Sequence, residues 1–488
     1  MKRFSHILLV LVTLIAFAAC DEFLNITPEG QIKQDELLST PEGIEDALYG
    51  AYSQLRGTSL YGQELSFSTI EILAQNFSCK GNTTITALVD YEYTNTSVKA
   101  VFESIWTAMY KNISNVNSIL AAPMVEAASA YPYTIYKGEA LGLRAFMHFE
   151  LIRLFADQIT QNPTITGLPY ATDFSLVTPD FESLAANYEH ILADLHEAEQ
   201  LLSDEAEYWG SSYFMTDRQI HCNLYAVQAL LSRVYLTKGD KAMAAQYARK
   251  VIEEGPYKLN VKTEINGDLA GVLSANETLF GIYFAEFYTN VYAKLQATTS
   301  YYSLNPRSDV ESIYEEEADG LDYRTTAYFT TVELGGVPTL RLSKLTDPYE
   351  LQGISSSRPQ ELIQGINLIR LPEMYYIVAE AELEAGNDSV ATWYFDQVLA
   401  SRGLTPLSER TVTDSIEGQA ISPSLTIERI NLERFKEYFG EGQTFYNLKR
   451  QHLPIHAIDE ATGVEKVIAA DRSIYVIPIP DSEFQNRY

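Results

Sequence analysis

The sequence contains few of the residues that build metal sites and covalent catalysts. Its 488 residues include 3 Cys and 7 His, and it has neither a His-Glu-x-x-His motif nor a Cys-x-x-Cys pair. The Gly-x-Ser-x-Gly elbow, the phosphate-binding P-loop and the dinucleotide-binding glycine motif are also absent. The sequence therefore predicts no metal, no cofactor and no enzymatic activity. A glycoside hydrolase needs only two carboxylates, but nothing in the sequence marks such a pair.

Basic residues are scarce as well. The chain has 35 Lys and Arg against 65 Asp and Glu, which gives a formal net charge of −30. Nucleic-acid binding depends on neutralising phosphates with basic groups, so the composition argues against nucleic acid as a partner. The same charge favours a neutral ligand over an acidic polysaccharide. Tyr is abundant, with 33 copies, and its apolar ring with a polar hydroxyl suits a recognition surface in contact with water.

Long apolar runs are missing except at the N-terminus. Lys2 and Arg3 precede an apolar run, Ile7–Phe17, that is shorter than the roughly 20 residues a membrane-spanning helix needs. A positive start followed by a short apolar run is typical of a secretory signal peptide. We therefore expect this segment to direct export of the chain.

The end of this segment resembles a bacterial lipobox. Two alanines precede Cys20, although Phe17 stands where an aliphatic residue is usual. We predict that residues 1–19 are a lipoprotein signal peptide and that Cys20 becomes the acylated first residue of the mature protein. Ordinary signal-peptide cleavage after Ala18 is the alternative, and it would leave a free cysteine with no obvious use near the mature N-terminus.

Two cysteines follow this segment, Cys79 and Cys222. An oxidising compartment would permit a disulfide between them. Cys222 lies in an apolar helical run, where a buried and unreactive thiol is the common case. We therefore favour a free buried thiol at Cys222 and leave the disulfide open as the alternative.

Apolar residues recur at spacings of three and four along most of the chain, which is typical of amphipathic helices. Thr40 followed by Pro41 marks one helix start, because Thr can cap free amides and Pro fits the first turn. The pattern predicts a mainly α-helical protein. The expected helical runs are Gly43–Leu55, Val101–Leu120, Tyr136–Ala156, Phe181–Leu202 and Asn223–Glu254.

Two stretches have the spacing of a tetratricopeptide helix pair, with small residues at the helix crossing and a glycine turn. The clearer one turns at Gly239, and its second helix ends at Pro256. The weaker one lies between Leu371 and Ser401 and turns at Gly386. Two units this far apart do not make a regular solenoid, so we expect helix pairs embedded in one larger domain.

Two segments, Tyr257–Gly281 and Tyr323–Asn367, are rich in turn residues and partly β-like. Short strands are expected at Thr339–Ser343 and Ile366–Arg370. Long irregular segments inside a compact domain often form binding loops. Near the end of the chain, Ser473–Pro480 is too rich in proline for a helix, so we expect it to be extended.

A series of short motifs occurs in a fixed order along nearly the whole chain. These are Cys20-Asp21-Glu22-Phe23-Leu24, Ala47–Tyr52, Ile105–Tyr110, Leu143–Phe146, Leu151–Phe155, Ile369–Tyr376, Ala379-Glu380-Ala381, Glu433-Arg434, Gly440-Glu441-Gly442, Leu448–Arg450 and Pro478-Ile479-Pro480. In this order they resemble the SusD/RagB family of outer-membrane nutrient-binding lipoproteins of Bacteroidetes. The chain departs from the family's pattern at Gln443, where Arg is usual, at Asn447, where Asp is usual, and at Ala156-Asp157, where Gly is usual.

This resemblance implies a mainly α fold of the SusD type, built on tetratricopeptide-like helix pairs with long loops and a few short strands. It implies one domain over residues 20–488, with an N-terminal helical part at about 20–255 and a C-terminal part at about 256–488. Family members bind a nutrient without catalysis, usually an oligosaccharide and sometimes a peptide. They are lipid-anchored to the cell outer membrane and partner a SusC-like TonB-dependent transporter. The alternatives are a peptide-binding family member and a tetratricopeptide-like scaffold for protein interactions.

Charged residues of these motifs are expected to hold helices together, because their helical spacing brings no acid–base set to one point. These residues are Arg144, Arg370, Glu373, Glu380, Glu433 and Arg434. Aromatic residues at helical spacing are expected in the core. These residues are Phe146, Phe149, Tyr375, Tyr376, Trp393 and Phe395.

The ligand face is expected to come from the loop before the helix of Trp106 and from the irregular segment after Gly281. Tyrosines mark both places, in polar stretches where a ring has no obvious core to join and is expected to be exposed. Sugars stack on aromatic rings while amides bond their hydroxyls. The candidate ligand-binding residues are Tyr91, Tyr93, Tyr288, Tyr292, Tyr301 and Tyr302. The alternative is that these rings pack locally and order their own loops.

Overall fold

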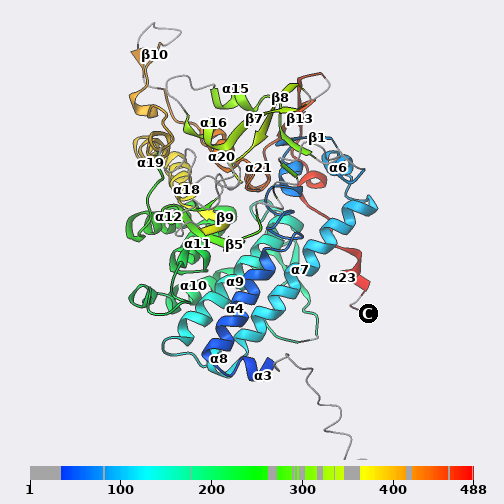
Figure 1. Ribbon diagram of the computed structural model, residues 1–488, viewed down its shortest axis with the longest axis vertical. Coiled ribbons are helices and arrows are strands. Elements are labelled where there is room, and N and C mark those ends of the chain that lie inside the picture. The colour runs from blue at the N-terminus through cyan, green and yellow to red at the C-terminus, as the bar shows by residue number, and fades with distance from the viewer. Residues whose placement is uncertain are drawn as a thin grey trace, which may run out of the picture.

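The computed structural model describes most of the chain (Figure 1). The described residues are 34–80, 83–175, 177–261, 272–287, 291, 294–295, 303–315, 322–334, 336–345, 363–413, 420–421, 423–459, 462–485 and 487. The predicted signal peptide, Cys20 and four of the candidate tyrosines lie outside the described residues. These tyrosines are Tyr288, Tyr292, Tyr301 and Tyr302.

Helices make up most of the N-terminal part. The hydroxyl of Thr40 accepts a hydrogen bond from the amide of Gly43 at 3.1 Å, so the predicted helix start is confirmed. Asn95 caps α7 by accepting from the amide of Ser97. Among the described residues, no helix is both long and apolar enough to cross a membrane. The helices of this part are α3 (Gln34–Leu37), α4 (Pro41–Leu55), α5 (Thr69–Leu73), α6 (Thr83–Val89), α7 (Thr96–Leu120), α8 (Pro123–Glu126), α9 (Tyr133–Phe155) and α10 (Leu184–Leu201).

Helix α9 lies at the centre of this part. It packs against α4, α7, α8 and α10, and every residue from Gly138 to Phe155 is buried. Gly142 permits a close approach, since a Cβ atom there would lie 2.5 Å from Sγ of Cys222. Cys222 is a free buried thiol. The interpretation favoured from the sequence is therefore confirmed, and the disulfide alternative is wrong.

The two predicted helix pairs lie next to each other in space. Gly239 and Gly386 make the turns, with φ of +90° and +78°, values that a side chain disfavours. In order, α10 packs on α11, α11 on α12, α12 on α18, and α18 on α19. The two pairs therefore form one continuous stack, and the residues between them in sequence are an insertion into it (Figure 1). The four helices are α11 (Leu224–Lys238), α12 (Lys241–Glu254), α18 (Leu371–Glu384) and α19 (Asp388–Ser401).

Short antiparallel strands complete the fold, and two of them, β5 and β9, contact α11 of this stack. β4, β9 and β5 form a three-stranded sheet in that order. The strands expected at Thr339–Ser343 and Ile366–Arg370 are confirmed as parts of β8 and β9. The strands are β1 (Phe77–Lys80), β2 (Thr166–Pro169), β3 (Phe181–Ser183), β4 (Val272–Leu273), β5 (Thr278–Tyr283), β6 (Ser303–Pro306), β7 (Phe329–Leu334), β8 (Val337–Leu342), β9 (Ile363–Arg370), β10 (Val412–Thr413), β11 (Ala420–Ile421), β12 (Ile455–Asp459) and β13 (Val464–Ile468).

Three expectations are wrong in detail. The run from Phe181 begins as strand β3, because Ser183 caps α10 by accepting from the amide of Ala186. The C-terminal segment begins with a short helix, α22. Trp393 is 54% exposed, because the opposite face of α19 supplies the core residues. The remaining helices are α15 (Val310–Glu315), α16 (Tyr323–Tyr328), α20 (Ile427–Tyr438), α21 (Thr444–Gln451), α22 (Arg472–Tyr475) and α23 (Asp481–Gln485).

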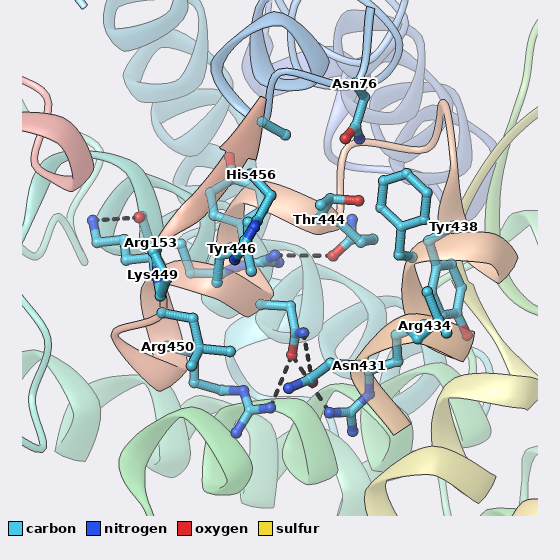
Figure 2. A pocket seen from close by; sticks show the side chains of 18 of the residues that line it. Asn76, Arg153, Asn431, Arg434, Tyr438, Thr444, Tyr446, Lys449, Arg450 and His456 are labelled. Carbon is cyan, nitrogen blue, oxygen red and sulfur yellow. Dashed lines mark hydrogen bonds between the residues drawn. The ribbon is translucent and has the colours of Figure 1, made fainter. Parts of the chain in front are cut away.

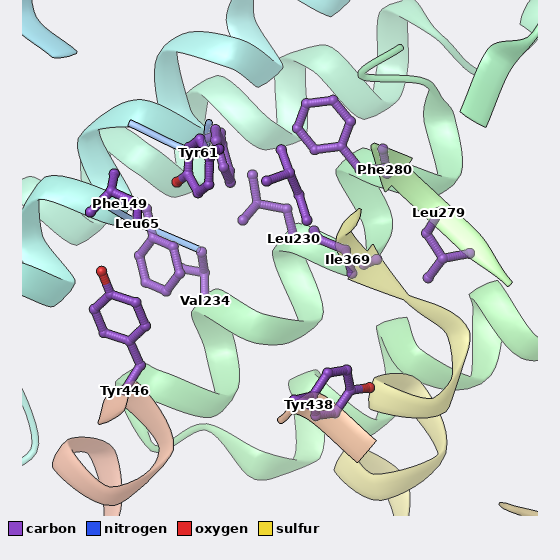
Figure 3. Close-up of a cluster of buried hydrophobic side chains, with 14 of the residues drawn as sticks. Tyr61, Leu65, Phe149, Leu230, Val234, Leu279, Phe280, Ile369, Tyr438 and Tyr446 are labelled. Atoms are coloured by element: carbon purple, nitrogen blue, oxygen red, sulfur yellow. The ribbon is translucent and has the colours of Figure 1, made fainter. Parts of the chain in front are cut away.

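The two parts of the chain share an apolar cluster (Figure 3). Phe149 of α9 and Val234 of α11 lie in the same cluster as Ile369 of β9 and Tyr446 of α21. Contacts of this kind connect segments that are far apart in the sequence. They hold the C-terminal helices against the helical stack.

A buried ion network lies beside this cluster in the C-terminal part. Glu437 of α20 is 0% exposed and accepts hydrogen bonds from Arg370 at 2.7 Å and from Arg402 at 2.9 Å. Burial alone would raise the pKa of Glu437, but the adjacent guanidiniums, that of Arg402 first, hold it well below its ordinary value. The network joins the cations Arg324, Lys344, Arg370, Arg402 and Lys436 to the carboxylates Glu277, Asp322, Glu433, Glu437 and Glu441.

The predicted structural role of the charged motif residues is confirmed. On α9, Arg144 pairs with Asp194 of α10 at 2.6 Å. Arg370, Glu433 and their partners lie in the buried network described above, and the remaining residues join neighbouring helices. These residues are Glu373, which pairs with Arg233, and Glu380, which pairs with Arg434 and Arg450.

Candidate functional site

A cavity of about 580 Å³ lies where the N-terminal and C-terminal parts meet. The end of α9, α11, α20 and α21 form its walls (Figure 2). Asn76, just before β1, and Arg307, just after β6, also line it, and the amide of Arg307 donates to the carbonyl of Asn76 at 3.0 Å. His456 and Glu465 line it with side chains that are 53% and 57% exposed, so they mark its outer edge. The volume is in the range of about 300–1,000 Å³ that is usual for small-molecule sites.

Helix α20 buries three charged side chains in the ion network and presents apolar residues, together with Glu428 and Asn431, to the cavity. Glu433, Lys436 and Glu437 are 0% exposed, because they belong to the ion network. Leu432 and Phe435 are only half-buried and line the cavity. This is the reverse of an ordinary surface helix, which buries its apolar face. Other apolar lining residues are Ile313, Leu448, Leu453 and Pro454.

Arginines in the cavity wall are already paired. The guanidinium of Arg233 donates to both oxygens of Glu373, at 2.7 and 2.6 Å. That of Arg450 donates to both oxygens of Glu380, at 2.7 and 2.8 Å, and Arg434 binds the same carboxylate. Although burial alone would raise the pKa of Glu380, the charges of Arg450 and Arg434 hold it well below its ordinary value.

Lys449 and Arg153 form the side of the cavity nearest the end of α9. The ammonium of Lys449 donates to the carbonyls of Arg153 and Ala156, at 2.7 and 2.8 Å, and so satisfies the last turn of the helix. Burial lowers the pKa of Lys449 to about 7. The guanidinium of Arg153 lies 3.7 Å from the ring centre of Tyr446 and donates to the side-chain oxygen of Gln443 at 2.9 Å.

Neutral amides form a further face of the cavity. The amide of Asn447 donates to the oxygen of Asn431 at 3.0 Å, and both residues are half-buried lining residues. Gln451 donates to the side-chain oxygens of both, at 2.7 and 3.1 Å. Apolar side chains and neutral amides are therefore available on adjacent helices.

Several buried polar atoms in residues that line the cavity have no hydrogen-bond partner among the described residues. They are Oδ1 of Asn76, Nη2 of Arg434, the hydroxyls of Tyr438 and Tyr446, and Oγ1 of Thr444 (Figure 2). Buried polar groups are normally paired, and leaving them unpaired raises the free energy of the folded state. Within the described ranges, no group of three or more His, Cys, Asp or Glu side chains is placed to hold a metal ion.

The two described candidate tyrosines are packed rather than exposed. Tyr93 is 6% exposed, and its hydroxyl donates to the carbonyl of Ile474 at 2.7 Å. Tyr91 is half-buried and donates to the carbonyl of Leu73 at 2.8 Å. Burial raises the pKa of both hydroxyls. The expectation that these two rings are exposed is wrong, because each finds a backbone acceptor in a distant segment. Their contribution to ligand binding stays a prediction.

One strand pair joins residues that flank the two segments expected to form the ligand face. β1 precedes the loop of Tyr91 and Tyr93, and β6 directly follows Tyr301-Tyr302. The antiparallel register places Lys80 opposite Ser303 at one end of this pair and Phe77 opposite Pro306 at the other.

The sequence argument did not find the cavity. Its walls come from stretches far apart in the chain, so no local motif describes it. One signal was present in the sequence. Each of the three departures from the family pattern includes a residue that lines the cavity, namely Gln443, Asn447 and, from Ala156-Asp157, Asp157.

Comparisons with known proteins agree with the order of the motifs. A family model described as starch-binding and associating with the outer membrane matches residues 22–236, and a model of the SusD family matches residues 287–487. A SusD-like protein of Formosa agariphila is 24% identical, with 99% of this chain and 97% of the relative covered. A second SusD-like protein of that organism is also 24% identical, with 95% of each chain covered.

Solved structures share the fold. A SusD superfamily protein of Bacteroides thetaiotaomicron has 25% identity and a TM-score of 0.68, with 91% of this chain and 97% of that chain covered. A SusD-like carbohydrate-binding protein of Bacteroides vulgatus has 19% identity and a TM-score of 0.66, with 91% and 96% covered. The motifs, the mostly helical fold and the matching models and relatives all agree, and the chain belongs to the SusD family.

Proposed function

We propose that this protein binds a neutral oligosaccharide at the cell surface, without catalysis, and passes it to a SusC-like TonB-dependent transporter in the outer membrane. Family membership carries the proposal: one matching model is described as starch-binding and associating with the outer membrane. A protein of the same fold is described as carbohydrate-binding. The net charge of −30 and the 33 tyrosines support a neutral ligand that stacks on rings.

A glycan array probed with the soluble chain from residue 21 tests the ligand class. We expect binding to neutral oligosaccharides and weaker binding to glycans that contain uronic acids, because the acidic chain repels them. A peptide array run in parallel tests the peptide-binding alternative, and binding to peptides alone would replace the proposed ligand. Hydrolysis of a bound glycan by the purified protein would overturn the non-catalytic role.

Affinity purification of a tagged chain from detergent-solubilised outer membranes tests the partner. We expect a TonB-dependent transporter to copurify in near-equal amount. An unrelated surface lipoprotein with the same tag is the control. If the transporter is no more abundant with this chain than with the control, the proposed delivery step is wrong.

The proposed membrane anchor is Cys20. One acyl chain binds a membrane only marginally, so stable anchoring needs the several chains of a bacterial lipoprotein. Cells grown with labelled palmitate are expected to label the wild-type protein and to leave Cys20→Ala unlabelled. Equal labelling of both proteins would remove the anchor from the proposal.

We place the outer ligand face beyond the Lys80–Ser303 end of the β1–β6 pair, where Tyr301 and Tyr302 join β6. Loss of one stacked ring is expected to weaken binding roughly two- to twelvefold. Titration calorimetry on Tyr301→Ala and Tyr302→Ala measures this, with Tyr213→Ala as a matched control, because Tyr213 is 84% exposed. Wild-type affinity in both variants would place the face elsewhere.

A further inference from the structure

The cavity between α9, α11, α20 and α21 is separate from the outer ligand face proposed above. Asn76 and Arg307 line the cavity and adjoin the Phe77–Pro306 end of the β1–β6 pair. The proposed outer face lies beyond the opposite end, at Lys80. Four strand residues span about 13 Å. The cavity is therefore a second place at which this protein can hold part of a ligand.

The apolar wall of the cavity calls for an occupant with apolar surface. Leu432 and Phe435 remain half-buried on a helix that buries Glu433 and Glu437 completely. Contiguous accessible apolar residues with a polar rim mark binding sites. A sugar ring has apolar C–H groups on its faces, and an aromatic ring such as that of Phe435 can stack against them.

The ionic groups of the wall favour an uncharged occupant. The guanidinium of Arg233 is held by both oxygens of Glu373, and that of Arg450 by both oxygens of Glu380. A ligand carboxylate would have to compete with Glu373 and Glu380 for these guanidiniums, and a ligand ammonium would have to compete with the guanidiniums for the carboxylates. An uncharged ligand leaves every pair in place.

The remaining polar groups of the cavity wall can form hydrogen bonds with the hydroxyls of a ligand. Asn431 and Asn447 are half-buried amides in the wall. Their oxygens accept from neighbouring side chains, and each NH2 group uses one of its two hydrogens in the cluster, so one N–H of each remains to donate to a ligand. Gln443 is a further neutral amide in the lining. Arg434 and Thr444 also line the cavity, and each has one buried polar atom, Nη2 and Oγ1 respectively, without a hydrogen-bond partner among the described residues. A ligand with several hydroxyls offers the partners that these groups lack.

We propose that this cavity is a second subsite, which encloses one uncharged sugar ring of the bound oligosaccharide. The ring stacks on Phe435 and contacts Leu432, while one of its hydroxyls accepts a hydrogen bond from the amide of Asn447. The rest of the oligosaccharide leaves the cavity at its outer edge, beside His456 and Glu465. This inference rests on the proposed function, because it assigns part of the same ligand to a defined site.

Filling the cavity and removing its aromatic ring test the subsite. Leu432→Trp places a larger side chain in the cavity, and Phe435→Ala removes the stacking ring. Val390→Trp is the matched control, because Val390 is 41% exposed on α19 and is not among the cavity-lining residues. The neutral probes are maltoheptaose, cellohexaose, xylohexaose and mannohexaose, and tetragalacturonic acid is the charged probe. Affinities come from titration calorimetry, and thermal unfolding checks that each variant is folded.

We expect the wild type and Val390→Trp to bind at least one neutral probe with equal affinity. Leu432→Trp should lose binding, and Phe435→Ala should bind roughly two- to twelvefold more weakly, as expected for one stacked ring. If Leu432→Trp does not fold, Phe435→Ala decides the question alone. If the wild type binds and the folded cavity variants bind equally well, the subsite is wrong and the proposed function stands. Preference for tetragalacturonic acid would overturn the uncharged assignment. If no neutral probe binds the folded wild type, the subsite and the oligosaccharide function both fail.

Discussion

Both α9 and α20 bury charged side chains, but the two interiors differ in how these charges are arranged. In α9, Leu143, Ala145 and Phe149 are 0% exposed and pack in an apolar core, and the buried charges of this helix lie in ion pairs at separate places, such as Arg144 with Asp194. In α20, Glu433 and Glu437 are also 0% exposed, but they lie in a network in which five cations face five carboxylates. Ions remain charged in such a place only when each one is paired.

The difference between these two interiors explains how the cavity acquires its apolar wall. Burial of apolar surface is non-directional, so α9 can be covered by neighbours on every side. Charge-assisted hydrogen bonds have preferred directions, so the Glu433–Glu437 face of α20 is oriented toward its arginine partners. Leu432 and Phe435 then face the other way, into the cavity. The ionic interior therefore determines the chemistry of the proposed subsite.

Neutralising Glu437 should have the largest effect on stability. Glu437→Gln keeps the shape of the side chain and removes the charge that pairs with Arg324, Arg370 and Arg402. Breaking a buried pair by removing one partner costs about 3–5 kcal/mol. Urea unfolding followed by circular dichroism should show this loss in the free energy of unfolding.

A similarly conservative change in the apolar interior is the control for Glu437→Gln. Leu143→Met in α9 also keeps the size of the side chain, and it should cost less than about 1.5 kcal/mol. The contrast between the two interiors would be wrong if the two variants lost the same free energy of unfolding.

Lys449 of α21, which binds the end of α9, should contribute an intermediate amount to the free energy of unfolding, and this contribution should depend on pH. Lys449→Met removes the donor to the last carbonyls of α9, and unpaired buried acceptors cost about 1–3 kcal/mol. The folded pKa is about 7, below the unfolded value of about 10.4. Between these values the unfolded state binds more protons, so the contribution of Lys449 to stability rises with pH.

Unfolding free energies at pH 6 and pH 9 measure this dependence. The difference between the wild type and Lys449→Met should be larger at pH 9, because only the unfolded state then carries the proton. Lys466→Met, on strand β13, is the control, since this side chain is exposed. A difference that stays constant with pH would mean that Lys449 titrates normally in the folded protein.

Helices and turns were predictable because their causes are local. Thr40, Gly239 and Gly386 act through their own backbone neighbourhood, and the structure places each of them as expected. The contact between α12 and α18 was not predictable, since the insertion between the two helix pairs hides their adjacency. The burial of Tyr93 was missed for a similar reason, because its partner, Ile474, is hundreds of residues away in the chain.

The cavity was the feature hardest to predict, because the segments that form it are far apart in the sequence. Its lining depends on which face of α20 is buried, and that depends on arginines such as Arg324 and Arg402, which come from other segments. The motifs predicted six of the residues that form ion pairs, but not Arg324, Arg402 or Glu437 at the centre of the network. The motifs also do not reveal that a helix with buried charges leaves an apolar face toward a cavity. That conclusion required the three-dimensional packing.

The turns of the two helix pairs allow a finer comparison. Gly386→Ala places a Cβ at φ +78° with no atom within 4 Å of it, so only the backbone strain of about 1–2 kcal/mol is expected. Gly239→Ala places a Cβ at φ +90° and 3.0 Å from Cγ2 of Thr160, so it should lose more. Thermal unfolding of both variants measures the difference. Gly386→Asn should recover part of the loss, because Asn tolerates this conformation, and equal losses for Asn and Ala would argue against backbone strain as the cause.

The smallest loss of stability is expected for Glu384→Gln, which lies one helical turn from the buried Glu380. On α18, Glu380 is 1% exposed and Glu384 is 62% exposed at their side chains, and Lys241 of α12 contacts both. Solvent screens the exposed pair, so Glu384→Gln should cost only about 0.2–1 kcal/mol. Glu380→Gln leaves Arg434 and Arg450 without their shared carboxylate and should approach the loss expected for Glu437→Gln. Measuring both in low and high salt separates them further, because only the Glu384 effect should shrink as salt is added. If Glu384→Gln destabilised the protein as much as Glu380→Gln, burial would not be the property that makes the ion pairs of this protein essential.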